Sequence, residues 1–147
     1  TQKIEEFLRA KGYKTAPHPY LLSYKRLAQL AGFGAFGKNA LIINPRYGPW
    51  IRLATVLTNA ELPPDKPFDQ DLCGNCNNCV EACPVNALTP YKVDDSKCLV
   101  GIHLISTDLT KYEDTLKKFE PSLTKSAHLT CMECQKACRY GKEEHSL

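Results

Sequence analysis

The sequence of 147 residues has no cysteine before residue 73, no run of basic residues and no apolar stretch long enough to cross a membrane. The lack of such a stretch argues against a membrane partner. Acidic and basic residues are interspersed and the net charge is only +3, which argues against a dedicated nucleic-acid-binding protein. We therefore expect neither membrane nor nucleic acid as a partner. The length suffices for one ordinary domain or two small ones.

The chain begins with Thr1 instead of methionine, and no signal-peptide pattern follows it. These features are consistent with a processed form or a fragment of a longer protein.

The glycine-rich stretch AGFGAFGKNAL at residues 31–41 fits two nucleotide-binding patterns. Gly32, Gly34 and Gly37 match G-x-G-x-x-G, and the same stretch matches G-x-x-x-x-G-K except that Asn39 replaces the required Ser or Thr. Both patterns need a strand before the loop and a helix after it, whereas here a helical pattern precedes and a strand pattern follows. We therefore interpret the stretch as a helix C-cap, with Gly32 or Gly34 left-handed, and a tight turn into a strand. A ligand on the exposed backbone amides remains compatible with this interpretation.

The spacing of apolar residues predicts short elements joined by turns. We expect helices over residues 2–10, 21–31 and 107–120, strands over residues 40–45 and 51–59, and a loop or short extended piece over residues 13–20. Residues 61–70 hold three prolines and three acidic residues, which is typical of a linker. We accordingly divide the chain into residues 1–64 and 65–147.

The run CGNCNNCVEACP at residues 73–84 is the most specific pattern in the chain. It is the C-x2-C-x2-C-x3-C-P run of bacterial two-cluster ferredoxins, whose first three cysteines bind one iron–sulfur cluster and whose fourth binds the other. The run therefore predicts two [4Fe–4S] clusters that share their ligands crosswise.

A second cysteine run repeats the last three cysteines of the first with the same spacing, and His128 stands where its first cysteine would be. Cys98 is the replacement available, and no cysteine is then left over. The expected ligands are Cys73, Cys76, Cys79 and Cys138 for cluster 1, and Cys83, Cys98, Cys131 and Cys134 for cluster 2.

Other uses of the eight cysteines are two four-thiolate zinc sites or a disulfide framework. Zinc sites usually present pairs of the form C-x2-C, so the spacing favours clusters. Thiolate clusters indicate a reducing, cytoplasmic environment. Each cluster carries one electron, so the pair forms a short electron path, and we expect a redox partner protein of the ferredoxin or flavodoxin type as electron donor.

A family resemblance follows from LAQLAGFGAFGKNALIINPRYGPW, then TVLTNAELPPD, then CGNCNNCVEACPVNAL. Over residues 6–139 the chain resembles the epoxyqueuosine reductase family and is similar to the related reductive dehalogenases. The resemblance implies a cobalamin-dependent reductase and an α+β chain, in which a partial nitroreductase-like α/β segment precedes a bacterial ferredoxin-like two-[4Fe–4S] domain. It also matches the partition of the cysteines given above.

The resemblance further implies that Gly37, Lys38 and Asn39 contact a corrinoid, with cobalamin as a further cofactor. The catalytic Asp of epoxyqueuosine reductases falls on His18, whose near-neutral pKa suits a proton donor. Tyr20 is a second candidate donor. The family's tRNA-holding helical tail has no counterpart here. We expect an iron–sulfur part of a cobalamin-dependent reductase, with a stand-alone ferredoxin-like carrier and a zinc-stabilised interaction module as alternatives.

Overall fold

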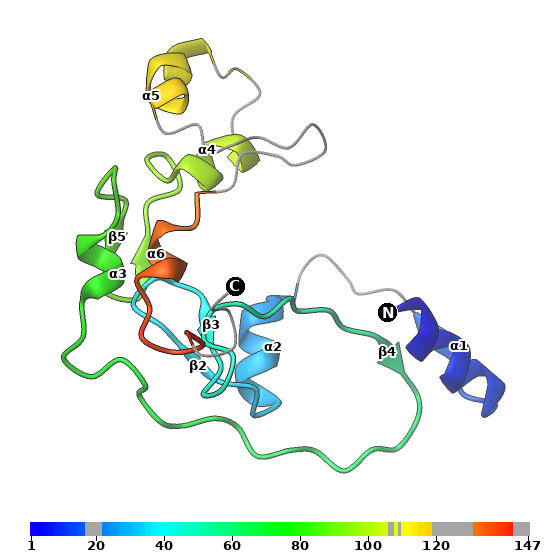
Figure 1. Cartoon of the computed structure of the whole chain (residues 1–147). Coiled ribbons are helices and arrows are strands. Elements are labelled where there is room, and N and C mark those ends of the chain that lie inside the picture. Colours follow the sequence, from blue (N-terminus) through cyan, green and yellow to red (C-terminus); the bar gives the residue numbers. More distant parts are fainter. Residues whose placement is uncertain (17–21, 106–107, 109, 119–130, 143–147) are drawn as a thin grey trace.

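The computed structural model describes residues 1–16, 22–105, 108, 110–118 and 131–142 (Figure 1). Short helices and antiparallel two-stranded sheets alternate along these residues, which is compatible with the expected α+β class. The helices are α1 Gln2–Ala10, α2 Tyr24–Leu30, α3 Asn78–Glu81, α4 Leu99–Ile105, α5 Glu113–Lys118 and α6 Glu133–Lys136. The strands are β1 Thr15–Ala16, β2 Ala35–Phe36, β3 Ile42–Ile43, β4 Leu57–Thr58, β5 Leu88–Thr89 and β6 Lys92–Val93. The sheets pair β1 with β4, β2 with β3, and β5 with β6.

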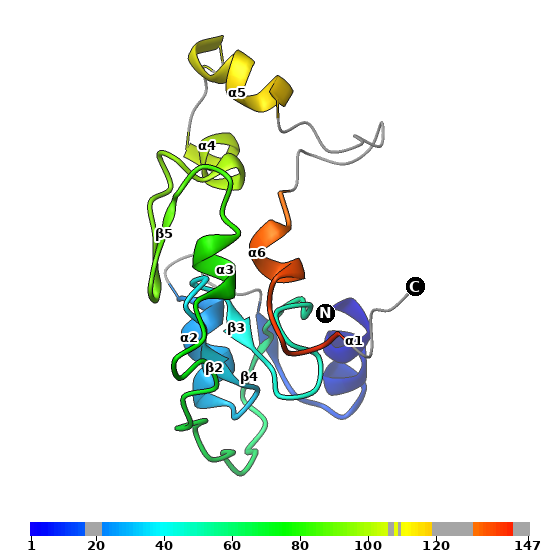
Figure 2. The same ribbon diagram turned by 60° about the vertical axis from the view of Figure 1, so that its left-hand side comes forward.

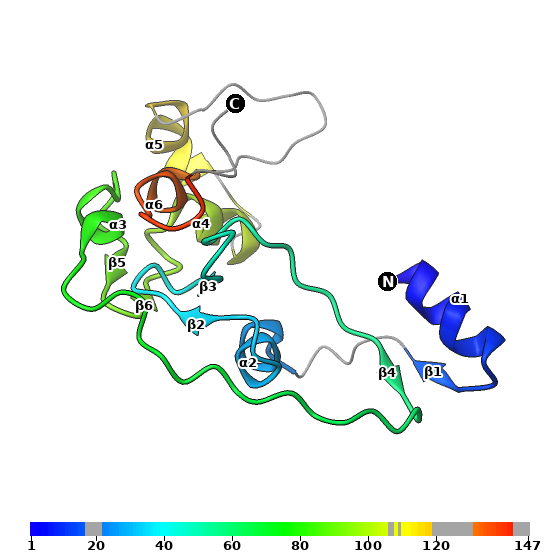
Figure 3. The same cartoon turned by 60° about the horizontal axis from the view of Figure 1, so that its bottom comes forward.

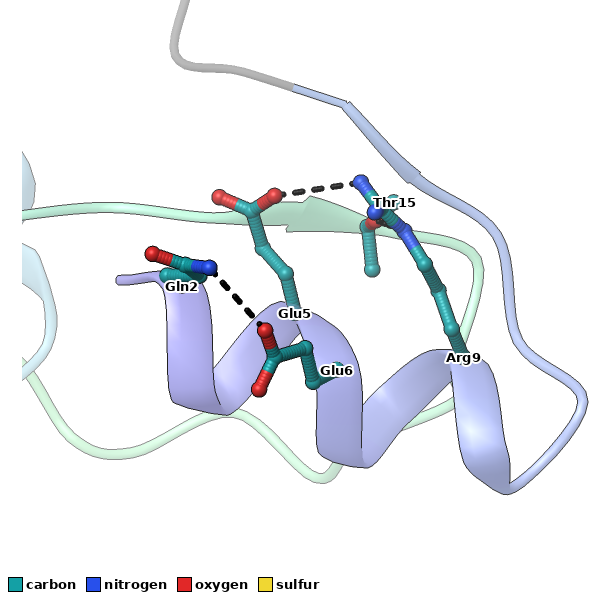
Figure 4. Close-up of polar contacts among 5 residues, drawn as sticks. All are labelled: Gln2, Glu5, Glu6, Arg9 and Thr15. Carbon is teal, nitrogen blue, oxygen red and sulfur yellow. Dashed lines mark hydrogen bonds and ion pairs between the residues drawn. The ribbon is translucent and has the colours of Figure 1, made fainter.

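Helix α1 confirms the first predicted helix, and it is tied to β1 by polar contacts (Figure 4). The guanidinium of Arg9 donates to Thr15 Oγ1 at 2.7 Å and lies 3.1 Å from the Glu5 carboxylate. Thr15 is paired with Thr58 in the antiparallel β1–β4 sheet. Figures 1 and 3 show α1, β1 and β4 away from α3 and α6. These elements therefore do not build the cysteine-rich part of the fold.

Helix α2 ends at the glycine loop in a Schellman motif. The Gly32 N–H donates to the Gln29 carbonyl at 3.1 Å, and the Phe33 N–H donates to the Ala28 carbonyl at 2.9 Å. Gly32 has a φ of +72°, the left-handed conformation that this motif requires. The predicted C-cap is therefore confirmed, with Gly32 and not Gly34 in the left-handed position.

The glycine loop continues into the β2–β3 hairpin, which packs against α2. The predicted strand over residues 40–45 is confirmed at β3, whereas β2 was not foreseen. Gly34 allows the hairpin to close, because a side chain there would overlap the carbonyl of Ile43. Both residues of β3 are buried in the core.

Two of the sequence predictions are only partly correct. The predicted strand over residues 51–59 forms only at β4, and residues 51–56 belong to no strand. The predicted helix over 107–120 contains a 3-10 turn at Thr110–Tyr112 and helix α5, while Leu109 and Phe119 lie outside the described residues.

The cysteine-rich part is organised around two one-turn helices, α3 and α6, which pack against each other (Figures 1 and 2). The β5–β6 hairpin covers α3, and α4 contributes the buried side chains of Leu99 and Ile102. Buried aliphatic side chains thus occur both in β3 of the glycine-loop region and in α4 of the cysteine-rich region.

The predicted linker at residues 61–70 has neither helix nor strand, as expected. Contacts nevertheless cross the proposed boundary, since the Phe68 N–H donates to the Gln29 carbonyl at 2.9 Å and the Gln135 side chain donates to the Pro49 carbonyl at 3.2 Å. The division into 1–64 and 65–147 stays a prediction. Among the described residues, no helix has the length and apolar character needed to cross a membrane.

Candidate metal centres

All eight cysteines lie in the described part of the chain, and each is a free thiol in this fold. They come from the loop before α3, from α3 itself, from the residue after its C-cap, from the residue preceding α4, and from the segment around α6. The disulfide framework considered from the sequence is therefore not the arrangement found among them.

Four thiols line one cavity: Cys73, Cys76, Cys79 and Cys138. Cys79 is the most enclosed, with only 8% of its surface exposed. Burial raises the pKa of the Cys79 thiol, and the nearby thiols of Cys73 and Cys138 raise that pKa further. Cys138 comes from the end of the second cysteine run, so the first cavity takes a thiol from both runs.

The remaining four thiols line a second, larger cavity of about 480 Å³: Cys83, Cys98, Cys131 and Cys134. Burial raises the pKa of the Cys134 thiol to about 12, and the neighbouring Cys131 thiol adds to the effect. The Ala87 N–H donates to Cys83 Sγ at 3.3 Å. Such N–H donors to sulfur are typical of iron–sulfur sites, whose potentials depend on them.

The packing of α3 against α6 explains why the two runs exchange one cysteine each. Cys83 follows the end of α3 and faces the second cavity, while Cys138 follows the end of α6 and faces the first. The two sets are those expected from the spacing, and their role as cluster ligands stays a prediction. The raised pKa values of Cys79 and Cys134 mean that metal binding at these two thiols must release their protons.

Within the described residues, no three side chains of Cys, His, Asp or Glu are arranged to hold a single metal ion. In a cubane cluster each thiolate binds a different iron atom, so the four sulfurs stand farther apart than around one ion. Each cavity is lined by four thiols, which is the number of protein ligands that a [4Fe–4S] cluster takes.

The first cysteine loop is held in shape by Asp71. Its carboxylate accepts from the Cys73 N–H at 2.9 Å and from the Gly74 N–H at 3.2 Å. The Tyr91 hydroxyl donates to the same carboxylate at 3.2 Å. The pKa of Asp71 is lowered chiefly by the Cys73 N–H, because that bond favours the charged carboxylate.

Lys38 joins the glycine loop to this cysteine loop. Its ammonium donates to the Gly74 carbonyl at 2.7 Å and to Asn77 Oδ1 at 2.9 Å, and its backbone N–H lies 3.4 Å from Cys73 Sγ. Only 8% of Lys38 is exposed. A buried ammonium needs such acceptors, since burial without them is costly. Sequence reasoning missed this contact because the partners lie 36 and 39 positions away.

Asn39 lies in the walls of both cavities. Its Oδ1 accepts from the Leu41 N–H at 3.2 Å, which fixes the orientation of the amide because a backbone N–H needs an oxygen acceptor. Its Nδ2 is buried and has no hydrogen-bond partner among the described residues. Leaving such a donor unsatisfied costs about 1–3 kcal/mol, so the position calls for an acceptor.

The second cavity also has a wall from the N-terminal segment. Lys25 and Arg52 lie there, and the Lys25 ammonium donates to the Ala40 carbonyl at 2.7 Å. Both cavities are therefore closed by residues before the proposed linker and by residues after it.

Of the remaining candidate residues, only those of the glycine loop belong to the part of the chain that the structure describes. His18, Tyr20 and His128 lie outside the described residues. Gly37, Lys38 and Asn39 are buried beside the cysteine loops, and their contact with a corrinoid stays a prediction.

Comparison with known proteins agrees with the chemistry of the thiols. Residues 72–141 match the model of a 4Fe-4S double cluster binding domain. Over 122 residues the chain is 37% identical to an epoxyqueuosine reductase of Listeria monocytogenes, a match that covers 82% of this chain and 30% of the relative.

Solved structures extend the similarity to the fold. The epoxyqueuosine reductase of Bacillus subtilis superposes with a TM-score of 0.75 and 28% identity, covering 96% of this chain and 36% of that one. An epoxyqueuosine reductase solved with an epoxyqueuosine-modified tRNA stem loop gives a TM-score of 0.74 and 27% identity, with 96% and 36% covered. The chain thus spans about a third of the length of these relatives.

Proposed function

The chain belongs to the epoxyqueuosine reductase family, a family of oxidoreductases, and from that premise we propose that it is the iron–sulfur electron-transfer part of a cobalamin-dependent reductase. The observation that carries the proposal is the grouping of eight free thiols around two adjacent cavities. A module of this kind takes up electrons from a donor protein and passes them on one at a time.

We assign cluster 1 to Cys73, Cys76, Cys79 and Cys138, and cluster 2 to Cys83, Cys98, Cys131 and Cys134. When bound, each cluster supplies a one-electron redox centre that changes little in geometry. The residues of the chain hold and surround the clusters. The thiols fix the position of each cluster, and Asp71 holds the first cysteine loop in shape. The N–H groups of Lys38 and Ala87 face sulfur atoms of Cys73 and Cys83.

The corrinoid part of the proposal rests on the family relationship. Residues 1–64 would form part of a nitroreductase-like cobalamin-binding domain, with Gly37, Lys38 and Asn39 as contacts and His18 as proton donor. Because all three loop residues are buried, we expect them to support the corrinoid site by holding the loop in place.

The substrate of the complete reductase is proposed from the relatives alone. The sequence led us to expect no nucleic-acid partner, but a related reductase has been solved with a modified tRNA stem loop. We therefore propose a modified nucleoside in tRNA as the substrate class. Cytoplasmic localisation and a ferredoxin- or flavodoxin-type donor stay predictions.

Cluster content tests the electron-transfer proposal directly. After anaerobic reconstitution, we expect about eight iron atoms and eight acid-labile sulfides per chain, since two [4Fe–4S] clusters contain that number. Dithionite reduction should give electron paramagnetic resonance signals of two magnetically coupled clusters. Stoichiometric zinc without sulfide would instead show a structural metal module and would refute the proposal.

Titration of cob(II)alamin into the reconstituted protein tests the corrinoid part separately. We expect the cobalt resonance to change and its usual axial-ligand signature to disappear. A two-cluster ferredoxin without the N-terminal segment is the matched control and should leave the spectrum unchanged. An unchanged spectrum with this protein, while both clusters remain reducible, would contradict corrinoid binding and favour the alternative of a ferredoxin-like carrier.

A further inference from the structure

Lys38 and Asn39 are neighbours in the glycine loop, and they are the polar or charged residues that the described core buries. Neither supplies a thiol to a cluster. Both nevertheless line a cavity that the thiols also line. The assignment of the cysteines as ligands does not explain why a charged and a polar side chain are buried there.

Lys38 places a positive charge beside the first cavity. Its ammonium is anchored on Gly74 and Asn77, both within the first cysteine loop, and its backbone N–H points at Cys73 Sγ. Of the two cysteine cavities in the described part of the chain, Lys38 lines the first alone. The ammonium is therefore hydrogen-bonded to residues that adjoin Cys73 and Cys76, two ligands of the first centre.

Asn39 occupies the wall between the two cavities. Its amide oxygen is used by Leu41, and its amide nitrogen is a buried donor that no described residue satisfies. Four cysteine thiols line each of the two cavities, and a bound cluster would add sulfides. Sulfur is therefore an acceptor that a bound cluster would bring to this position.

Reduction adds one negative charge to a cluster. A positive charge nearby and N–H donors to the sulfurs stabilise the reduced form and raise its potential. The effect is strongest where water is excluded, as it is around these two buried residues.

We propose that the Lys38–Asn39 pair sets the reduction potentials of the two iron–sulfur centres, with Lys38 acting on the first centre and the Asn39 amide donating to sulfur at the wall between the centres. This inference rests on the proposed function, since it requires the two clusters. It gives the glycine loop a role that neither nucleotide-binding pattern nor corrinoid contact describes.

Redox titration monitored by electron paramagnetic resonance tests the role of Lys38. In Lys38→Met we expect a more negative potential for the first centre and no change for the second. Lys38→Arg keeps the positive charge, so the potential of its first centre should stay close to the wild-type value. Lys92→Met is the matched control, because it removes the same charge from an exposed position on β6 and should move neither potential.

The role of Asn39 is tested with Asn39→Leu, which is close in size and has no donor. We expect a more negative potential for at least one centre. In the wild-type protein with asparagine side-chain amides labelled by ¹⁵N, electron–nuclear double resonance should detect coupling between an amide nitrogen and a reduced cluster. The part due to Asn39 is the part lost in the variant, because Asn75, Asn77 and Asn78 of the cysteine loop are labelled in both proteins. The wild-type measurement keeps the test valid if the variant loses its clusters, because absent coupling there overturns the role of Asn39.

The outcomes separate the two proposals. A wild-type protein that fails to assemble iron and sulfide refutes the proposed function itself. A wild-type protein with both clusters, together with Lys38→Met and Asn39→Leu variants that retain them at unchanged potentials, refutes only the role of the Lys38–Asn39 pair.

Discussion

Replacing Cys138 by alanine is expected to abolish the cluster bound to the first cysteine run and to leave the cluster bound to the second. Cys138 follows α6, yet it lies in one cavity with Cys73, Cys76 and Cys79. With three thiolates left, that centre loses a ligand that no other cysteine can replace, because the remaining four line the other cavity. Iron and sulfide should fall to about half.

Double variants decide whether the ligands cross. If Cys138 and Cys73 serve the same centre, Cys138→Ala combined with Cys73→Ala should retain about half of the iron, since only one of two clusters is lost. Cys138→Ala combined with Cys131→Ala should lose nearly all of it. Ligand sets that follow the two runs without crossing predict the reverse pair of results. Iron and sulfide analysis with the resonance of the reduced protein distinguishes the two patterns.

Cys83→Ala provides the reciprocal test from the other run. It should abolish the second centre and leave the first, and the magnetic coupling seen between two reduced clusters should disappear in either single variant. A Cys83→Ala variant that behaves additively with Cys134→Ala, losing both clusters, would contradict the assignment of these two cysteines to one centre.

The spacing of the cysteines could be read from the sequence because it reflects local geometry. Thiolates that wrap one cluster must be a fixed few residues apart, so C-x2-C-x2-C-x3-C-P specifies the loop and helix around Cys73 to Cys83. The C-cap of α2 was predictable for a similar reason, since the left-handed φ of Gly32 is a local preference of glycine.

Contacts between distant segments were not predictable in this way. The anchoring of Lys38 on Gly74 and Asn77 depends on how the glycine loop meets the cysteine loop, and no local pattern encodes it. Most of residues 51–56 are apolar or β-branched, which favours a strand, yet in the described fold these residues belong to none of the two-stranded sheets. Local propensity alone therefore did not decide their structure.

Gly34 packs so closely against the backbone of Ile43 that it has no room for a Cβ atom. It precedes β2, and a Cβ there would overlap the carbonyl carbon and oxygen of Ile43 in the paired strand β3. The obstacle is backbone, which cannot rotate away as a side chain can, so the two strands would have to separate. Because the loop between them carries Lys38 and Asn39, their separation would also displace the groups that face the cysteine cavities.

Gly34→Ala is therefore expected to destabilise the reconstituted protein by about 2 kcal/mol or more, in the range of overpacking of a close contact. Anaerobic thermal unfolding measures the effect, and the potential of the first centre should shift in the folded variant. Gly12→Ala is the matched control: Gly12 has a φ of +86° but open space around it, so the same substitution there costs only the left-handed conformation, about 1 kcal/mol. Equal unfolding midpoints for the two variants would contradict a packing role for Gly34, whereas a larger loss in Gly34→Ala would show that the close approach of the glycine loop to β3 contributes to stability.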